Sequence, residues 1–341
     1  MTTNGLPLHF GLDTFGDVWQ IDANQTLKNL IEQVTLADKV GVYSFNLGEH
    51  HRDDFVISAP DTVLSYMAAK TENIHLDTAV IVLSSDDPVR IYERFSTIQA
   101  LSGGRAQLTV GRGSFIESFP LFGYSLENYE QLFEEKLGLL HTILNNRPFT
   151  WEGELTPSYK DQYLFPPMET PLPVQVAVGG SPQSVVRAAK YDFGLRLAII
   201  GGDPLRFAPF AQLYRNAQEQ FGHTTPRTIG IHSPGLVAET DAEAIQAFYD
   251  PYVTHNARVG RERGWAPMDE ERFMNEVNYG ALFVGSVETV AQKIARAIKG
   301  IGADTFDLKI GTGSHDAQMR AIELYGTEVI PRVKELLADE A

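Results

Sequence analysis

The fold is decided by residues 78–113, TAVIVLSSDDPVRIYERFSTIQALSGGRAQLTVGRG. Residues 78–83 are apolar and rich in β-branched side chains, as in a buried parallel strand, and Pro88 suits the first turn of a helix. Glycines at 103–104 end that helix, and residues 106–110 form a second apolar run. The stretch therefore predicts a βαβ unit with two parallel strands.

The same alternation continues on both sides of this unit. Short apolar runs, which we interpret as strands, alternate with stretches whose apolar residues recur at helical spacing. The predicted strands are residues 8–12, 42–47, 74–83, 106–110, 174–178, 195–200, 228–237 and 306–310. Eight strands alternating with helices over 341 residues favour an α/β fold of the (β/α)8 TIM-barrel class over an open doubly wound sheet.

No linker-like tract divides the chain, so residues 1–341 are predicted to form a single barrel domain. Two excursions, at about 147–170 and 251–285, interrupt the pattern and are expected as insertions at the C-terminal face of the strands. The helix before the second excursion is expected to end near Thr254. The second excursion carries Arg258, Arg261, Arg263, Arg272 and Trp265. It is either a lid over an anionic ligand or a solvated helix with a mobile turn.

The composition narrows the classes of function. A net charge of −16 argues against a nucleic-acid or anionic-membrane surface, and the lack of cysteine excludes disulfides, thiolate metal sites and a cysteine nucleophile. No stretch approaches the roughly 18 apolar residues of a membrane span. The start of the chain, MTTNGLPLHFG, has neither a basic leader nor an apolar run. We therefore expect a cytoplasmic protein that acts on a small molecule.

Polar residues follow two of the predicted strands, at the barrel end where active sites are built. Glu49, His50 and His51 close the second strand, and histidines exchange protons near neutral pH. Arg112 stands between two glycines after the fourth strand, where the backbone approaches a ligand closely. Each feature also has a structural explanation: a loop cap and a core histidine for the first, a tight turn with a solvated arginine for the second.

The segment Gly179-Gly180-Ser181-Pro182-Gln183-Ser184 opens a helix after the fifth strand. Two glycines expose backbone N–H groups at a helix N-terminus, and the serines add hydroxyls, so the segment is suited to a phosphate. An ordinary turn with a serine N-cap explains the same residues. Arg112 on an earlier strand end favours the anion site.

Seven blocks in this order resemble the bacterial luciferase family of flavin-dependent oxidoreductases, and together they span nearly the whole chain. They are FGLDTF at residues 10–15, GEHH at 48–51, TAVIVL at 78–83, DPVRIYERF at 87–95, ALSGGR at 100–105, VGRG at 110–113 and VGGSPQSVVRAA at 178–189. Most blocks are weak signals alone, and the ordered set is specific.

The resemblance implies a barrel that binds FMN, with His50 at the position of the family's catalytic histidine and Glu49 and His51 orienting it. The Ala79-Val80 bond matches a position where the family often has a bulge or a cis peptide under the flavin ring. The implied cofactor-binding residues are Ala79, Val80, Arg112, Ser114, Phe115, Gly179, Gly180, Ser181 and Ser184. The Gly179-Gly180 pair departs from an acidic residue that some members place in this loop.

The implied activity is a monooxygenase reaction in which reduced FMN, delivered by a separate NAD(P)H:flavin reductase, and O2 oxidise an organic substrate. The absence of a Gly-x-Gly-x-x-Gly motif after the first strand agrees with an external reductant. The alternatives are an oxidoreductase that uses the deazaflavin F420, a metal-dependent TIM-barrel hydrolase, and a flavin-binding protein without turnover. No metal site is predicted, because strand one offers only His9 and Asp13.

Two further expectations concern partners. The resemblance implies a homodimer built on the helices at 62–70 and 88–102, whose apolar side chains include Tyr66, Met67, Tyr92 and Phe95. An apolar or aromatic substrate is expected from Phe115, Phe119, Phe122 and Trp151.

Overall fold

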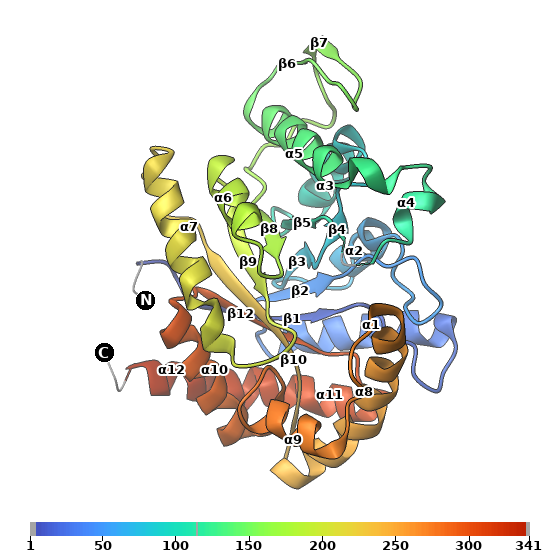
Figure 1. The fold of residues 1–341 in the computed structure, drawn as a ribbon, viewed down its shortest axis with the longest axis vertical. Helices are drawn as coiled ribbons and strands as arrows, with labels where there is room; N and C mark the ends of the chain where they lie inside the picture. Colours follow the sequence, from blue (N-terminus) through green and yellow to red (C-terminus); the bar gives the residue numbers. More distant parts are fainter. Residues whose placement is uncertain (1–4, 114, 339–341) are drawn as a thin grey trace.

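The computed structural model describes residues 5–113 and 115–338, which form a barrel of parallel strands surrounded by helices (Figure 1). The barrel strands, in spatial order, are β3 (His75–Thr78), β2 (Ser44–Leu47), β1 (His9–Thr14), β12 (Thr305–Lys309), β10 (Ile229–Ala238), β9 (Gly194–Ala198), β8 (Val174–Val178), β5 (Leu108–Gly111) and β4 (Ile81–Val82). A parallel bridge between Leu76 and Ala106 brings the two ends of this sheet together. The predicted (β/α)8 class is confirmed.

The helices begin and end at signals that the sequence carries. Asp87 accepts hydrogen bonds from the N–H groups of Val89 and Arg90 at the start of α3, and Gly302 takes the left-handed conformation that ends α10. The surrounding helices are α1 (Ala23–Lys39), α2 (Pro60–Ala68), α3 (Pro88–Leu101), α5 (Tyr129–Asn145), α6 (Pro182–Lys190), α7 (Ala208–Gln220), α8 (Asp241–Arg263), α10 (Val287–Ile301), α11 (His315–Leu324) and α12 (Ile330–Ala338).

Shorter elements fill the connections. They are the helices α4 (Ser118–Leu121) and α9 (Glu270–Asn278), the 3-10 turns η1 (Leu126–Asn128) and η2 (Pro204–Phe207), the π-helical turn η3 (Tyr325–Val329), and the strands β6 (Phe149–Trp151), β7 (Tyr159–Gln162) and β11 (Phe283–Ser286). No helix within the described residues combines the length and the apolar character that a membrane crossing requires.

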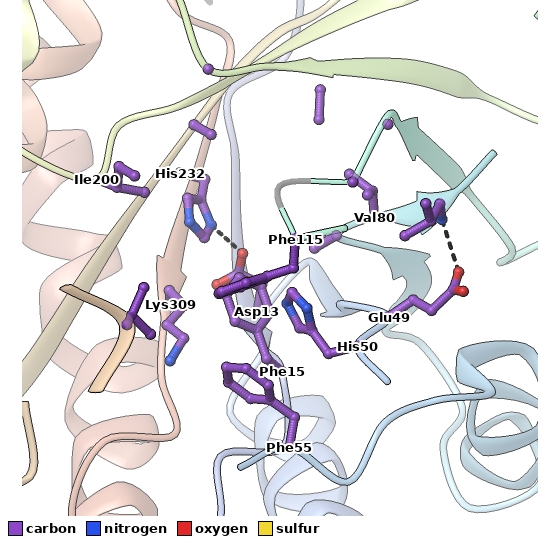
Figure 2. Close-up of a pocket in the computed structure, with 18 of the residues that line it drawn as sticks. Asp13, Phe15, Glu49, His50, Phe55, Val80, Phe115, Ile200, His232 and Lys309 are labelled. Carbon is purple, nitrogen blue, oxygen red and sulfur yellow. Dashed lines mark hydrogen bonds and ion pairs between the residues drawn. The ribbon is translucent and has the colours of Figure 1, made fainter. Parts of the chain in front are cut away.

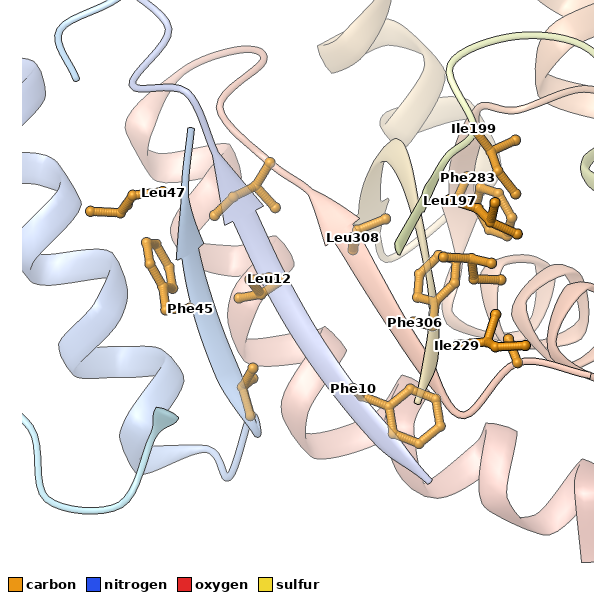
Figure 3. Close-up of a cluster of buried hydrophobic side chains, with 14 of the residues drawn as sticks. Phe10, Leu12, Phe45, Leu47, Leu197, Ile199, Ile229, Phe283, Phe306 and Leu308 are labelled. Carbon is orange, nitrogen blue, oxygen red and sulfur yellow. The ribbon is translucent and has the colours of Figure 1, made fainter. Parts of the chain in front are cut away.

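Apolar side chains on alternate strand positions form the main core, because successive residues of a strand point to opposite faces. Phe10 and Leu12 of β1 lie in register with Phe306 and Leu308 of β12, and all four side chains are buried (Figure 3). They share one cluster with apolar side chains of the helices. The core therefore lies between the barrel wall and the helices that surround it.

The intervening positions fill the barrel interior with polar groups. The guanidinium of Arg196 lies 3.2 Å from an Asp77 oxygen and 3.1 Å from an Asp307 oxygen, and all three side chains are buried. Asn46 donates to Asp307, and Thr109 donates to Asp77. Burial raises the pKa of Asp77 to about 6, although Arg196 opposes this rise. A buried ion network thus occupies the space inside the strands.

Two expected boundaries differ from the structure. The strand predicted at residues 74–83 is two strands, β3 and β4, and the Ala79-Val80 peptide bond between them is cis. Helix α8 continues to Arg263 instead of ending near Thr254, even though Pro251 lies inside it. Its beginning, a capping box of Thr240 and Glu243, was visible in the sequence, whereas its far end lacks strong apolar spacing.

The two excursions have regular structure. In the first, β6 and β7 form an antiparallel pair. In the second, α8 is followed by α9 and then by β11, which pairs in parallel with the second half of β10. The second excursion is therefore mostly helical, and it begins and ends on adjacent strands.

The helices expected at a dimer surface keep most of their apolar side chains inside the subunit. Met67 of α2 and Tyr92 and Phe95 of α3 are buried, whereas Tyr66 is 54% exposed. The apolar surface available to a partner on these helices is thus smaller than the sequence pattern indicated.

Gly11 has no room for a side chain. A methyl group there would lie 2.1 Å from Asp307 Oδ1 and 2.3 Å from Ser44 Oγ. We expect Gly11→Ala to lower the free energy of unfolding by about 1 to 3 kcal/mol, as overpacking of a core does, measured by urea denaturation. The control is Gly201→Ala, whose methyl group would meet no atom within 4 Å. Equal midpoints for the two variants would contradict the interpretation.

Candidate active site

A cavity of about 540 Å3 opens at the C-terminal ends of the barrel strands, between them and helix α8 (Figure 2). This volume lies in the range of small-molecule and cofactor sites. One part of the lining is aromatic and the other is charged. The aromatic part consists of Phe15, Phe55, Phe115, Tyr129, Tyr252 and Trp265.

Glu49 connects the end of β2 to the segment that contains the cis peptide bond. Its N–H donates to Val80 O at 2.9 Å, and its Oε2 accepts from the N–H of Val82 at 2.8 Å. Its Oε1 lies 2.7 Å from Nε2 of His51. Both predicted neighbours of His50 therefore line the cavity, but they bind each other and the backbone rather than the His50 ring.

His50 lies in the cavity wall among aromatic rings. Its ring centroid is 4.4 Å from that of Phe55, 4.8 Å from Phe15 and 5.1 Å from Phe115. Its Nδ1 lies 3.9 Å from Oε1 of Glu117. Burial opposes ionisation of the Glu117 carboxyl, but the interactions with His50 and with backbone N–H groups together lower the pKa of Glu117. The site thus pairs a histidine with an ionisable carboxylate that the sequence did not single out.

The residues predicted around a phosphate are divided between the cavity and its edge. Arg112 and Gly179 line the cavity, and Arg112 is paired with Glu130 and lies over the ring of Tyr129. The other three, Gly180, Ser181 and Ser184, form the N-terminal turn of α6 and are not among the lining residues.

The first turn of α6 uses its serines for its own structure. The Ser181 side chain accepts from the N–H of Ser184, and the buried Ser184 hydroxyl accepts from Arg187 at 3.4 Å. Gly180 has φ +118°, which allows this turn. Among the other predicted cofactor residues, Ala79, Val80 and Phe115 line the cavity, and Ser114 lies outside the described residues.

Sequence reasoning missed several lining residues. Asp13 and Phe15 belong to the FGLDTF block at the end of β1, and Lys309 ends β12, so their strand-end positions were the available signal. His232 is a polar residue within an otherwise apolar strand. By contrast, Trp151, expected beside the substrate, packs with the β6 and α5 cluster and does not line the cavity.

The C-terminal half of α8 covers the cavity mouth. Tyr252, His255, Asn256, Val259 and Arg263 line the cavity from this helix. Arg52, in the loop after β2, holds the helix through Glu262 at 2.6 and 2.8 Å. The guanidinium groups of Arg52 and Arg263 lie 4.6 and 4.3 Å from the centre of the Phe115 ring. These contacts anchor the C-terminal half of α8, and the lid and the solvated helix both remain predictions for this excursion.

Arg52→Met removes the charge that anchors α8 and keeps an apolar side chain. We expect the free energy of opening of this helix to fall by about 1 kcal/mol, so that tryptic cleavage after Arg261 is roughly fivefold faster. Cleavage is followed by mass spectrometry in the native protein. Arg332→Met is the matched control, because Arg332 also binds two carboxylates but lies on α12. Equal cleavage of both variants at Arg261 would show that Arg52 does not anchor the helix.

Within residues 5–113 and 115–338, no group of three or more His, Asp or Glu side chains is placed to hold a metal ion. A metal-dependent hydrolase requires such a group. The described part of the chain therefore lacks the ligand cluster on which that alternative depends.

The family model described as "Luciferase-like monooxygenase" matches residues 8–305. The chain belongs to this family. The match supports an oxidoreductase that incorporates oxygen, and the predicted resemblance is confirmed.

Named relatives are distant in sequence. An N-acetyl-S-alkylcysteine monooxygenase of Bacillus subtilis is 28% identical over 80% of this chain and 84% of its own length. The limonene 1,2-monooxygenase of Rhodococcus erythropolis is 25% identical over 65% of this chain and 58% of its own length.

Solved structures share the fold of this luciferase-like chain. The monooxygenase RslO1 of Streptomyces bottropensis has a TM-score of 0.83 at 20% identity, covering 95% of this chain and 99% of its own. The oxygenating constituent of 3,6-diketocamphane monooxygenase of Pseudomonas putida, in complex with FMN, has a TM-score of 0.78 at 21% identity. The match covers 96% of this chain and 99% of its own. A coenzyme F420-dependent tetrahydromethanopterin reductase of Methanopyrus kandleri has a TM-score of 0.75 at 17% identity, and the match covers 96% of this chain and 99% of its own. At these identities the likeness concerns the fold.

Proposed function

We propose that this luciferase-like protein is an FMN-dependent monooxygenase that oxidises a small apolar or aromatic substrate with O2. The observation that carries the proposal is the cavity at the strand ends, which combines His50, an aromatic wall and Arg112 in a member of a monooxygenase family. Bound reduced FMN would supply the electrons that activate O2.

The cavity has features that fit FMN. Gly111 has no space for a side chain, because a methyl group there would meet Val80 at 2.9 Å, and Gly113 has φ +84°. These glycines let the backbone approach a flat ring closely. Arg112 would hold the phosphate together with backbone N–H groups at Gly180, at the start of α6.

His50 is the candidate acid or base. Its ring is held by three phenylalanine rings, and Glu117 lies beside Nδ1, so a proton can pass between imidazole and the cavity without a change of ring position. The aromatic wall excludes water from the reacting atoms. Glu49 and His51 would maintain the backbone around His50.

The reduced flavin would come from a separate NAD(P)H:flavin reductase. The chain carries no Gly-x-Gly-x-x-Gly motif after its first strand. A homodimer and a cytoplasmic location remain predictions from the sequence, and Tyr66 on α2 is the exposed aromatic residue on the expected dimer face.

Arg112→Ala is expected to weaken FMN binding by about 1.5 to 3 kcal/mol, the contribution of a charged hydrogen bond. Binding is measured by quenching of flavin fluorescence. Glu130→Gln is the matched variant, because Glu130 pairs with Arg112 and adds negative charge near the phosphate. It should bind FMN at least as tightly as the native protein. Unchanged affinity in a folded Arg112→Ala variant would remove Arg112 from the phosphate site.

The F420 alternative is tested in the same titration. The acidic tail of F420 calls for cations at the cavity mouth. Two arginines there, Arg52 and Arg258, are already paired with carboxylates of Asp53, Asp54 and Glu262. We therefore expect FMN to bind more tightly than F420, and tighter binding of F420 would replace FMN as the proposed cofactor.

His50→Ala is expected to bind FMN normally and to oxidise substrate at least about 100-fold more slowly, the usual effect of losing an acid or base. The wild type is first assayed with reduced FMN and O2 on an alkanal, limonene and an N-acetyl-S-alkylcysteine, the compound classes named for relatives. The best of these is then used for the variant. His315→Ala, on α11 outside the cavity, is the control. Full activity of His50→Ala would return His50 to a structural role.

A further inference from the structure

A second histidine lines the cavity on the other side of the aromatic rings from His50. The Nδ1 of His232, on β10, is hydrogen-bonded to Oδ2 of Asp13, on β1, and both residues line the cavity. Figure 2 shows His232 beside Asp13. The ring of Phe15 contacts both histidines, at 4.8 Å from His50 and 6.2 Å from His232 between centroids. The pair of His232 and Asp13 is thus separate from the histidine and carboxylate pairs at the end of β2, His50 with Glu117 and His51 with Glu49.

The contact with Asp13 determines the tautomer of His232. A carboxylate accepts hydrogen bonds, so Nδ1 carries the hydrogen and Nε2 of the neutral ring carries the lone pair. No described residue forms a hydrogen bond with Nε2. The other oxygen of Asp13, Oδ1, is buried without a hydrogen-bond partner. The pair is therefore aligned to take a proton at Nε2, with the carboxylate offsetting the charge of the imidazolium that forms.

A purely structural histidine in this cavity has different surroundings. His255 of α8 lines the same cavity and packs edge-on against Phe55. Burial lowers the pKa of His255, so it is neutral at pH 7, and no carboxylate is bonded to it in the described structure. A buried aspartate beside a histidine costs desolvation free energy that an apolar pair would avoid. Because the pair of Asp13 and His232 is retained despite this cost, we interpret it as functional.

We infer that His232 is the general base for a substrate with an acidic hydroxyl on an aromatic ring or an enol. This inference rests on the proposed monooxygenase function and specifies its substrate class. The substrate O–H bond breaks, the proton passes to Nε2, and the electron pair stays on the oxygen. No electron is transferred in this step. The resulting phenolate or enolate is electron-rich at the neighbouring carbons, which prepares one of them for oxygenation.

The aromatic wall suits the same substrate class. Phe15, Phe55, Phe115 and Trp265 give a flat ring apolar contacts, and Nε2 of His232 offers its hydroxyl a hydrogen-bond acceptor. A substrate without a hydroxyl would leave that acceptor unpaired, which weakens its binding.

Charged groups from each neighbouring strand surround His232. Beside Asp13 on β1, β12 contributes Lys309 and Asp307, and β9 contributes Arg196. The Lys309 ammonium is bound to both oxygens of Asp17 at 2.7 and 2.8 Å. Lys309 is therefore the alternative source of stabilisation for a phenolate, by charge alone and without taking a proton.

The test uses 4-nitrophenol, whose absorbance reports directly whether its hydroxyl is ionised. The full-length protein is titrated with the probe over a range of pH, without flavin. In the wild type, bound 4-nitrophenol should be ionised at a pH about one unit or more below that for the free probe, because His232 takes the proton. His232→Gln keeps a hydrogen-bonding group but cannot take a proton, so it should bind the probe and lose the shift. Asp13→Asn should reduce the shift.

His255→Asn is the matched control, because it removes another histidine of the cavity, one with no bonded carboxylate among the described residues, and should leave the shift in place. Thermal unfolding confirms that each variant is folded. A shift that persists in His232→Gln would overturn the inference and assign the effect to another group of the cavity, Lys309 or His50. Failure of the wild type to bind or ionise the probe would overturn the substrate class. FMN binding is measured on the same preparations. A wild type that does not bind FMN would contradict the proposed monooxygenase function, whereas a changed 4-nitrophenol shift concerns only the role of His232.

Discussion

One buried cation organises the inside of this barrel. Arg196 comes from β9 and binds Asp77 of β3 and Asp307 of β12, strands that are not its neighbours in the sheet. The guanidinium therefore links distant parts of the ring across its interior. Removing one partner of such a buried pair usually costs about 3 to 5 kcal/mol, because the remaining charge is left unpaired. The register of three strands thus depends on this one arrangement.

The polar interior continues into the cavity. Asp13 and Lys309 follow Asp307 and its neighbours toward the C-terminal strand ends, and Arg196 itself reaches the cavity lining. The apolar side chains contributed by the loops and α8 close the space from above. A ligand would lie between charged side chains at the strand ends and aromatic side chains of the loops and α8, an arrangement suited to a flat molecule with one polar edge.

The sequence predicted the barrel well because its signals are local. Apolar runs, capping residues such as Asp87, and glycines at helix ends each act within a few residues, and β/α alternation follows from them. Contacts between distant strands have no such local signature. The pairings of Asp13 with His232 and of Arg196 with Asp77 join residues more than a hundred positions apart. They depend on the closed ring, which exists only in three dimensions.

The candidate site was predicted in part for the same reason. His50, Arg112 and Gly179 stand at strand ends, which sequence patterning can locate, and they line the cavity. The roles of Glu49 and Ser184 could not be predicted, because their partners are the backbone of Val82 and the side chain of Arg187. Helix α8 was expected to be shorter, since its far end lacks strong apolar spacing and is held by tertiary contacts such as that of Arg52 with Glu262.

The connection of α8 and α9 to the sheet has a consequence for how this fold diversifies. The segment leaves from the end of β10 and returns through β11. These two strands pair in parallel, from Gly235 with Phe283 to Ala238 with Ser286. Both attachment points are thus held side by side by backbone hydrogen bonds, independently of what lies between them. The intervening helices form a module that can be replaced or lengthened without moving the barrel strands. Substrate preference and barrel stability are in this way separated along the chain, and each can change without the other.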